Sequence, residues 1–454
     1  MERHQVSSQK WAIGLFTVGV FMAGLDNGII STALTTIGES FGVSPSWGAW
    51  TVTLYTLGLA ISTPIIGKLS DRYGRKRLFI IEIALFGFGS VLVALSPNFL
   101  ILLMARVIQA IGGGGIFIIG SSHILATLPK EVQGKALGML GGMHGLSAVI
   151  GPNLGAVILS LTGSWQWMFL INVPIAIILI LFAFWKLDES RPGTEKPLDM
   201  MGTALLTISI LSFMYGITQM GNTSFHVVNL LFIVVGLIGF IFLVFHERNL
   251  ENKGADPILS YSLLTERKYI GTLILGFLSG GFLAGIIFIP AFVQQVLNVP
   301  VEHAGYWVTP LALASGVGAG IGGVVTDKYG PLRAIYASGI IGIIGFSLFV
   351  FIVNGFVSFS IASALAGISL GILLGAPLNM LAGESAKETE KGTAIGTLSL
   401  IRQIGLTIFP AVFAGFIAIS KTDGYRQMFL TAAALALLVI LVGMLLAKQS
   451  HTKQ

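Results

Sequence analysis

The feature that most constrains this chain is a series of apolar runs, each about 20 residues long, along nearly all of its 454 residues. An α-helix rises 1.5 Å per residue, so about 20 apolar residues cross the roughly 30 Å of hydrocarbon in a bilayer. The composition agrees, because 54% of the residues are apolar and 10% are charged, against roughly 25% charged in a soluble domain. A transmembrane β-barrel is excluded, because its strands would alternate apolar and polar residues. We therefore predict an all-α polytopic membrane protein.

Fourteen membrane spans are predicted from the apolar runs. They cover 11–34, 48–67, 78–95, 100–120, 134–160, 167–186, 200–220, 227–246, 269–292, 304–325, 334–353, 357–382, 393–418 and 427–447. With a cytoplasmic N-terminus, the inner segments hold 22 of the 26 Lys and Arg residues, and the spans hold only Arg106 and Arg402. The positive-inside rule therefore places both termini in the cytoplasm and the chain in the cell membrane. The same topology explains the net charge of +6, so we expect no nucleic-acid partner.

A charged cassette occurs twice in this apolar chain. The stretch GKLSDRYGRKR (67–77) holds five basic residues, and GGVVTDKYGPLR (322–333) repeats its pattern with Asp327 placed 256 residues after Asp71. Both copies fall in predicted inner loops, after the second and the tenth span, which indicates a parallel internal repeat with two extra spans between its halves. We expect a six-helix bundle over 1–190, an inserted helix pair over 191–250 and a second six-helix bundle over 251–454.

The first cassette closely resembles the signature loop between helices 2 and 3 of the major facilitator superfamily. Three further stretches resemble the fourteen-helix branch of drug:proton antiporters in this superfamily, namely LDNGIISTAL, RVIQAIGGG and GPNLGA. Together with SWQWMFLINVP, they extend the resemblance over essentially the whole chain. It implies a major facilitator fold of two pseudo-symmetric bundles plus two inserted helices. The chain departs from the family pattern at Gly28, Ser31, Thr35, Ala110, Gln166, Pro331 and Leu332.

The cassette and the GPNLGA stretch carry the expected gating residues. By resemblance, Gly67, Asp71, Arg72 and Arg75 latch the inner gate, and Asp327 serves the second copy, because a carboxylate can meet a helix N-terminus or an arginine. The alternative is that the cluster only sets the topology. By resemblance again, Gly151, Pro152 and Gly155 seal the cavity and favour export, while plain packing of small residues is the alternative.

Asp26 is the one acid placed deep inside a predicted span, where a charge costs about 2.5–3.5 kcal/mol unless it meets water or a partner. Counting residues puts Asp26 about 12 Å and Arg106 about 9 Å below the outer helix ends, so the two can share a level. Burial disfavours the charged carboxyl and a guanidinium favours it, so small rearrangements could load or release a proton. A static ion pair is the alternative. Glu302 and His144 are further candidates for the proton relay.

The remaining candidates line the expected cavity or lie at helix ends. Substrate contacts are expected from Met22, Asn27, Phe117, Met143, Phe288, Gln294, Trp307, Asn379 and Arg402, although Met and Phe are often plain packing residues. Arg402 could bind an acidic substrate group or form a structural pair. Glu82 and Glu384 are expected to snorkel to the cytoplasmic surface or to pair with basic residues there.

The chain contains no cysteine and no GxxxxGK[ST] loop, so we expect no metal, cofactor or nucleotide, and an ion gradient must supply the energy. The leading hypothesis is a proton-coupled multidrug exporter that works as a monomer on amphipathic drugs. A lipid or glycolipid flippase of the same fold is the alternative. Uptake by symport is disfavoured by GPNLGA, and an enzyme or receptor by the absence of a catalytic motif such as HExxH.

Overall fold

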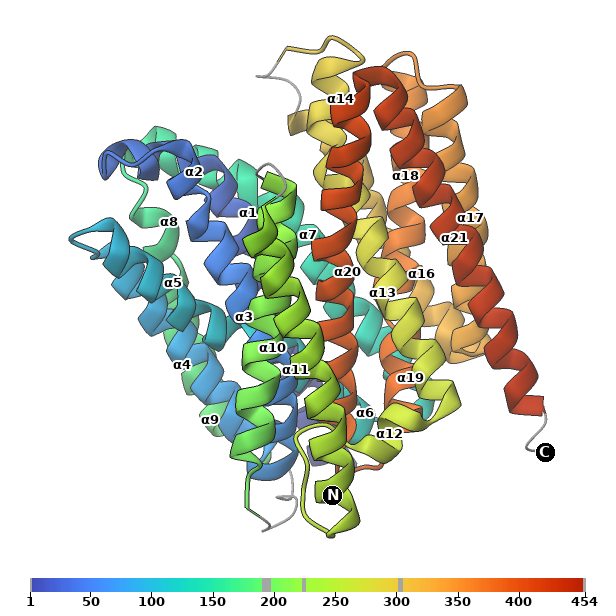
Figure 1. The fold of residues 1–454 in the computed structure, drawn as a ribbon. Helices are drawn as coiled ribbons and strands as arrows, with labels where there is room; N and C mark the ends of the chain where they lie inside the picture. Colours follow the sequence, from blue (N-terminus) through green and yellow to red (C-terminus); the bar gives the residue numbers. More distant parts are fainter. Residues whose placement is uncertain (1, 190–196, 223–225, 301–304, 452–454) are drawn as a thin grey trace. The chain divides into compact units, whose positions relative to one another are not determined.

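The computed structural model describes residues 2–189, 197–222, 226–300 and 305–451, and every regular element in these ranges is a helix. Within these described ranges, thirteen helices are long and apolar enough to cross a membrane, or up to fourteen if the bent helix α7 (Lys130–Thr162) is one span. The prediction of an all-α polytopic membrane protein is confirmed. Figure 1 shows the order of the helices along the chain.

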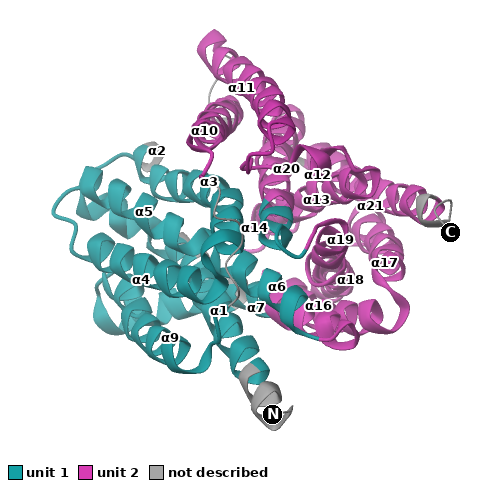
Figure 2. Ribbon diagram, turned by 90° about the horizontal axis from the view of Figure 1, so that it is seen from below, with its two compact units in different colours: residues 1–128, 143–196, 388–396 teal, residues 129–142, 197–387, 397–454 magenta. Residues whose placement is uncertain are grey.

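The chain divides into two compact units, which Figure 2 shows in different colours. Unit 1 comprises residues 1–128, 143–196 and 388–396, and unit 2 comprises residues 129–142, 197–387 and 397–454. The chain changes unit inside α7 and inside α20 (Lys391–Ile419), so each of these two helices contributes to both units. The boundaries predicted near residues 190 and 250 stay predictions.

Unit 1 is built around helices from the first part of the chain. Besides its share of α7 and α20, it contains α1 (Glu2–Ser40), α2 (Pro45–Gly48), α3 (Trp50–Tyr73), α4 (Arg75–Ala94), α5 (Phe99–Gly114), α6 (Ile116–Thr127), α8 (Trp167–Leu170) and α9 (Asn172–Lys186). Helix α4 packs between α5 and α9, and α3 packs along α5 (Figure 1).

Unit 2 is built around helices from the second part of the chain. It contains α10 (Met200–Asn222), α11 (Val227–Asn252), α12 (Tyr261–Thr265), α13 (Arg267–Ile287), α14 (Ile289–Gln295), the short 3₁₀ helix η1 (Gly305–Val308), α16 (Thr309–Tyr329), α17 (Pro331–Phe351), α18 (Phe356–Leu374), α19 (Pro377–Ser385) and α21 (Lys421–His451). Helices α10 and α11 pack on each other, and only 17% of the most apolar window of α11 is buried, the lowest share among the candidate spans. Such an all-round apolar helix suits a lipid environment.

Several spans are interrupted where glycine or proline occurs. The fourth span changes from α5 to α6 at Gly115, within a run of four glycines. Helix α7 bends by 40° between its segments Lys130–Ser147 and Ile150–Thr162. Pro152 accounts for this bend, because proline lacks the N–H that would bond to the backbone four residues earlier. These interruptions free backbone groups that side chains can then bind.

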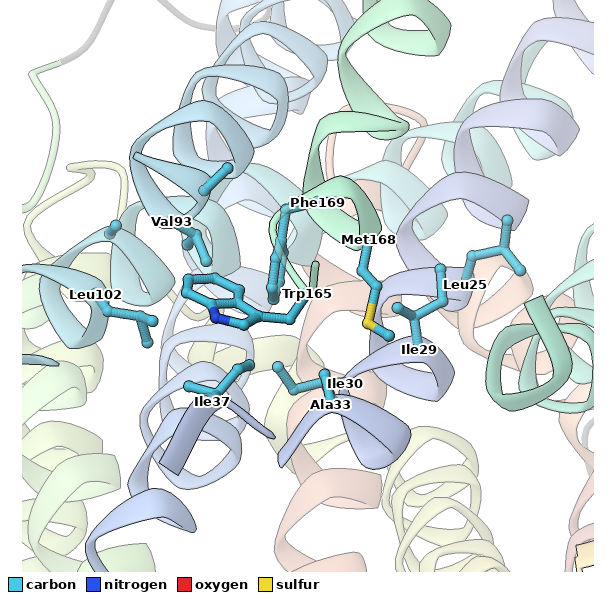
Figure 3. Packing of buried hydrophobic residues seen from close by; sticks show 12 residues of the cluster. Leu25, Ile29, Ile30, Ala33, Ile37, Val93, Leu102, Trp165, Met168 and Phe169 are labelled. Atoms are coloured by element: carbon cyan, nitrogen blue, oxygen red, sulfur yellow. The ribbon is translucent and has the colours of Figure 1, made fainter. Parts of the chain in front are cut away.

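An apolar core in unit 1 fixes α1 beside the segment that leads into α9 (Figure 3). Trp165, Met168 and Phe169 pack against Ile29 and its neighbours on α1. The indole Nε1 of Trp165 donates a hydrogen bond to the hydroxyl of Ser40 at 3.2 Å, so this large ring is packed and oriented. On α1 the core residues from Ile29 onward follow Asp26, and on the other side the core residues Trp165, Met168 and Phe169 directly precede α9. The core therefore brings the start of α9 close to Asp26.

Candidate proton-coupling and gating sites

Asp26 and Arg106 form an ion pair inside unit 1. Arg106 Nη1 lies 2.6 Å from Asp26 Oδ2, and the two side chains are 0% and 1% exposed. Asp26 comes from α1 and Arg106 from α5, so the structure brings together the two groups that were expected at one depth. An ion pair with so little solvent depends on its other hydrogen bonds, because neither charge is hydrated.

Gln109 closes this pair into a ring. It lies one turn after Arg106 on α5, and its Oε1 accepts a hydrogen bond from Arg106 Nη1 at 2.6 Å while its Nε2 donates to Asp26 Oδ1 at 2.8 Å. Ser90 of α4 accepts from Gln109 Nε2 at 2.9 Å, and Asn172 at the start of α9 donates to Ser90 at 3.3 Å and to Asp26 Oδ1 at 3.5 Å. All five side chains are buried, so the network joins four helices.

Arg106 is held in place by groups that carry no charge. Its Nε donates to the backbone oxygen of Thr51 at 3.2 Å, and its guanidinium lies over the ring of Tyr55, 4.0 Å from the ring centroid. Cation–π contacts of this kind favour a desolvated arginine. Arg106 Nη2 and Asn172 Oδ1 have no hydrogen-bond partner among the described residues. The Nη2 group of Arg106 and the Oδ1 acceptor of Asn172 are therefore not used by the network in this structure.

The first cassette holds the N-terminus of α20. Asp71 Oδ1 accepts from the backbone N–H of Gly392 at 2.9 Å, and Oδ2 accepts from the backbone N–H of Thr393 at 2.8 Å. These donors belong to the first turn of the helix, where backbone N–H groups lack partners inside the helix and the dipole favours a negative charge. Arg75 Nη2 lies 3.2 Å from Asp71 Oδ1, and Arg75 Nε donates to the hydroxyl of Ser122 at 3.2 Å. Asp71 and Arg75 are both buried, so the interaction is shielded from solvent.

The second cassette repeats the aspartate contact inside unit 2. Asp327 accepts from the backbone N–H of Gly134 at 2.6 Å and from that of Lys135 at 2.7 Å, both in the second turn of α7. Four residues after Asp327 stands Pro331, so the second copy has no counterpart of Arg75. The side chain of Asp327 is also half-buried, whereas that of Asp71 is buried. In both copies the aspartate therefore accepts hydrogen bonds from two backbone N–H groups of another helix. We expect the contact of Asp327 to be the weaker one.

A glycine precedes each aspartate by one turn and allows the helices to meet. A Cβ on Gly67 would lie 2.9 Å from the carbonyl carbon of Gly392, and a Cβ on Gly323 would lie 3.0 Å from that of Gly134. Contacts below 3.0 Å are not tolerated by real side chains without a shift of the backbone. The guanidinium of Arg72 lies over the ring of Tyr73, 5.2 Å from the centroid, and the place of Arg72 in the latch stays a prediction.

The GPNLGA stretch packs against α1. A Cβ on Gly151 would lie 2.7 Å from the Cα of Gly28 and 3.0 Å from the backbone oxygen of Leu25. One turn further along α7, a Cβ on Gly155 would lie 3.2 Å from the backbone oxygen of Ile29. The departure from the family pattern at Gly28 thus has a structural reason, because a side chain there would collide with α7.

Glu82 does not lie at a surface, so the expectation that it snorkels or pairs with a basic residue is wrong. It is fully buried in α4, and its Oε2 accepts a hydrogen bond from the backbone N–H of Gly115 at 2.9 Å. That N–H is freed by the break between α5 and α6. Glu384 behaves as expected, because Lys268 Nζ lies 2.7 Å from its Oε2.

The other predicted contact residues have mixed positions. Met22 and Asn379 are fully buried and present no surface to a ligand in this structure. The half-buried ones are Phe117, Met143, Phe288, Gln294, Trp307 and Arg402. The ring centroid of His144, an exposed residue, lies 6.3 Å from that of Phe117. Glu302 and the side chain of Asn27 lie outside the described residues.

Sequence reasoning missed Gln109, Ser90 and Asn172 as parts of the site. Each is a hydrogen-bonding residue inside an apolar run, which is the one signal that could have singled them out. The described ranges hold no group of three or more His, Cys, Asp or Glu residues that could hold a metal ion.

The long apolar helices define a multi-pass membrane protein, and the family that its sequence matches makes it a transporter rather than an enzyme. Residues 16–410 match the Major Facilitator Superfamily, and the chain belongs to this family.

Relatives are found in bacteria, and solved structures share the fold. The chain is 58% identical over 430 residues to "Uncharacterized MFS-type transporter YfiU" of Bacillus subtilis (strain 168), an alignment that covers 92% of this chain and 81% of that protein. It is 32% identical over 419 residues to "Multidrug resistance protein 3" of the same organism, covering 90% and 79%. The crystal structure of the human organic anion transporter MFSD10 (TETRAN) aligns with a TM-score of 0.70 at 16% identity, over 96% of this chain and 99% of that chain.

Proposed function

We propose that this transporter is a proton-coupled antiporter that exports amphipathic drugs across the cell membrane by alternating access. The observation that carries the proposal is the buried pair of Asp26 and Arg106, a titratable acid and its counter-charge in the interior of unit 1. The relative named "Multidrug resistance protein 3" supports the drug class.

The charge on Asp26 decides how the groups of the network can bond. With the carboxylate charged, Arg106 and Gln109 each donate one short hydrogen bond to it in a low-dielectric interior, and a third bond joins Arg106 to Gln109. With the carboxyl protonated, the ion pair is lost and Arg106 must find other acceptors. A substrate that shifts α1 or α5 thus changes the affinity of Asp26 for a proton, and a proton changes the affinity for substrate.

The driving force suffices for export. One elementary charge that crosses 100 mV supplies about 2.3 kcal/mol, which supports roughly a fifty-fold concentration ratio at 1.4 kcal/mol per factor of ten. The close contact of Gly28 and Gly151 is suited to keep ions from leaking past the network, because backbone atoms meet there without a gap. The contacts of Asp71 and Asp327 are suited to open and close as the helices move.

The test is proton release from the purified protein in weakly buffered detergent. Rhodamine 123, a cationic amphiphile, is expected to release protons from the wild-type protein, and a pH gradient is expected to drive its uptake into inverted vesicles. The Asp26→Asn variant should lose both, whereas Asp423→Asn, the same change at an exposed residue, should keep both. Undiminished gradient-driven uptake by Asp26→Asn would exclude Asp26 as the proton carrier, and uptake without any gradient would exclude the antiport mechanism.

A further inference from the structure

Arg402 is the second of the two arginines that the sequence places inside a predicted span, and its surroundings differ from those of Arg106. It lies on α20 in unit 2, and its Nε and Nη2 atoms are buried without a hydrogen-bond partner among the described residues. No carboxylate oxygen in the described ranges lies within ion-pair distance of its guanidinium, while Arg106 has Asp26 at 2.6 Å. Of the two arginines that the sequence places inside spans, Arg106 is thus neutralised by Asp26, whereas no described side chain supplies a counter-charge to Arg402.

The two orphaned atoms have a defined geometry. Nε and Nη2 lie on the same edge of the planar guanidinium, so their N–H bonds point in parallel. This is the edge that binds both oxygens of a single carboxylate, which makes arginine the preferred residue for bidentate recognition of such groups. An ammonium group or an amide could not satisfy the pair in this way, because neither offers two parallel acceptors.

A purely structural role does not explain the side chain. The crossing of α13 and α20 beside Arg402 is made by backbone, because a Cβ on Gly280 would lie 2.6 Å from the backbone nitrogen of Leu406 and one on Gly405 would lie 3.2 Å from the carbonyl carbon of Phe277. The helices therefore meet through glycines and do not need the guanidinium. Buried N–H donors of a charged group that lack a partner are costly in free energy, and charged residues in a membrane span mark sites where a ligand or ion binds.

We propose that Arg402 binds the carboxylate of the exported substrate, so that the transporter accepts amphipathic molecules with an acidic group in addition to their apolar body. This inference rests on the proposed function and deepens it by naming a substrate class. The acid supplied by the ligand completes an interaction that no described side chain supplies.

The matched dyes rhodamine 110 and rhodamine 123 test the proposal, because they differ in a free carboxylate and its methyl ester. Binding to the purified full-length protein is measured by fluorescence anisotropy. Loss of a charge-assisted bidentate contact should weaken rhodamine 110 binding about 10- to 100-fold in Arg402→Gln, with less than a two-fold change for rhodamine 123. Arg402→Lys, which keeps the charge and loses the fork, should lie in between. Arg426→Gln is the control, because it removes the same charge from an exposed residue of unit 2.

Thermal unfolding provides a second readout. Arg402→Gln removes an uncompensated charge, so its unfolding temperature without ligand should equal or exceed that of the wild type. Rhodamine 110 should raise the unfolding temperature of the wild type and not that of the variant. Equal weakening of both dyes, or unchanged binding of rhodamine 110, would overturn the role of Arg402. Neither outcome bears on the proposed function, which is tested by the gradient-driven uptake of rhodamine 123.

Discussion

Gly28 of α1 and Gly151 of α7 meet backbone to backbone, so that a Cβ on Gly28 would lie 2.9 Å from the Cα of Gly151. Alanine at position 28 must push the two helices apart, and overpacking of this kind typically costs about 1–3 kcal/mol. We expect Gly28→Ala to lower the unfolding temperature and to leak protons in reconstituted vesicles.

The control for this variant lies on the same helix. A Cβ on Gly14 would meet nothing within 4 Å, so Gly14→Ala should leave stability and proton leak unchanged. Thermal unfolding and the decay of an imposed pH gradient measure the two effects. If both alanines behaved alike, the contact between Gly28 and Gly151 would have no role in sealing.

The two cassette aspartates are expected to contribute unequally to transport. Asp71 binds two backbone N–H groups and pairs with Arg75, whereas Asp327 binds two N–H groups alone and is half-buried. Asp71→Asn should keep expression and orientation and cut transport strongly, and Asp327→Asn should cut it less. Drug uptake into inverted vesicles, normalised to protein amount, measures the difference. Normal transport by Asp71→Asn, together with poor insertion of Arg75→Ala, would leave charge bias as the whole role of the cassette.

Helices α10 and α11, which we predict to be an inserted pair, are expected to lie outside the translocation path. The apolar window of α11 is only 17% buried, and the two helices pack on each other. The chain has no native cysteine, so single engineered cysteines along both helices can be labelled from water without background. Labelling should be low along their apolar faces and unaffected by substrate. Substrate-dependent labelling along a whole face would contradict the prediction.

Part of the site followed from the sequence because depth in a membrane can be counted. The rise per residue placed Asp26 and Arg106 at one level, and the structure joins them in an ion pair. Rotation about the helix axis cannot be counted in the same way, since nearly every face of these helices is apolar. Ser90 and Asn172 therefore escaped notice, although their side chains point at the same network.

Glu82 shows where counting fails. The predicted span began at residue 78, which put Glu82 one turn from the surface, but α4 begins at Arg75 and continues directly from the loop of the first cassette. The carboxyl group then reaches the freed N–H of Gly115, a partner that exists only because the fourth span is broken there. The fold class was predictable from composition and length, whereas this contact depends on an irregular backbone that no periodicity reveals.

The last prediction separates a proton carrier from a static ion pair. Asp26→Asn leaves Arg106 as a buried cation without its counter-charge, which typically costs about 3–5 kcal/mol and should lower the unfolding temperature. Adding Arg106→Gln removes that cation, so the double variant should recover most of the lost stability. Transport should stay absent in both variants, because neither holds the titratable group. Thermal unfolding and pH-gradient-driven uptake of rhodamine 123 measure the two properties on the same preparations. A double variant that regained transport along with stability would show that the pair only fixes helix packing, and the proton would then have to be carried by another group, of which Glu302 and His144 are the candidates.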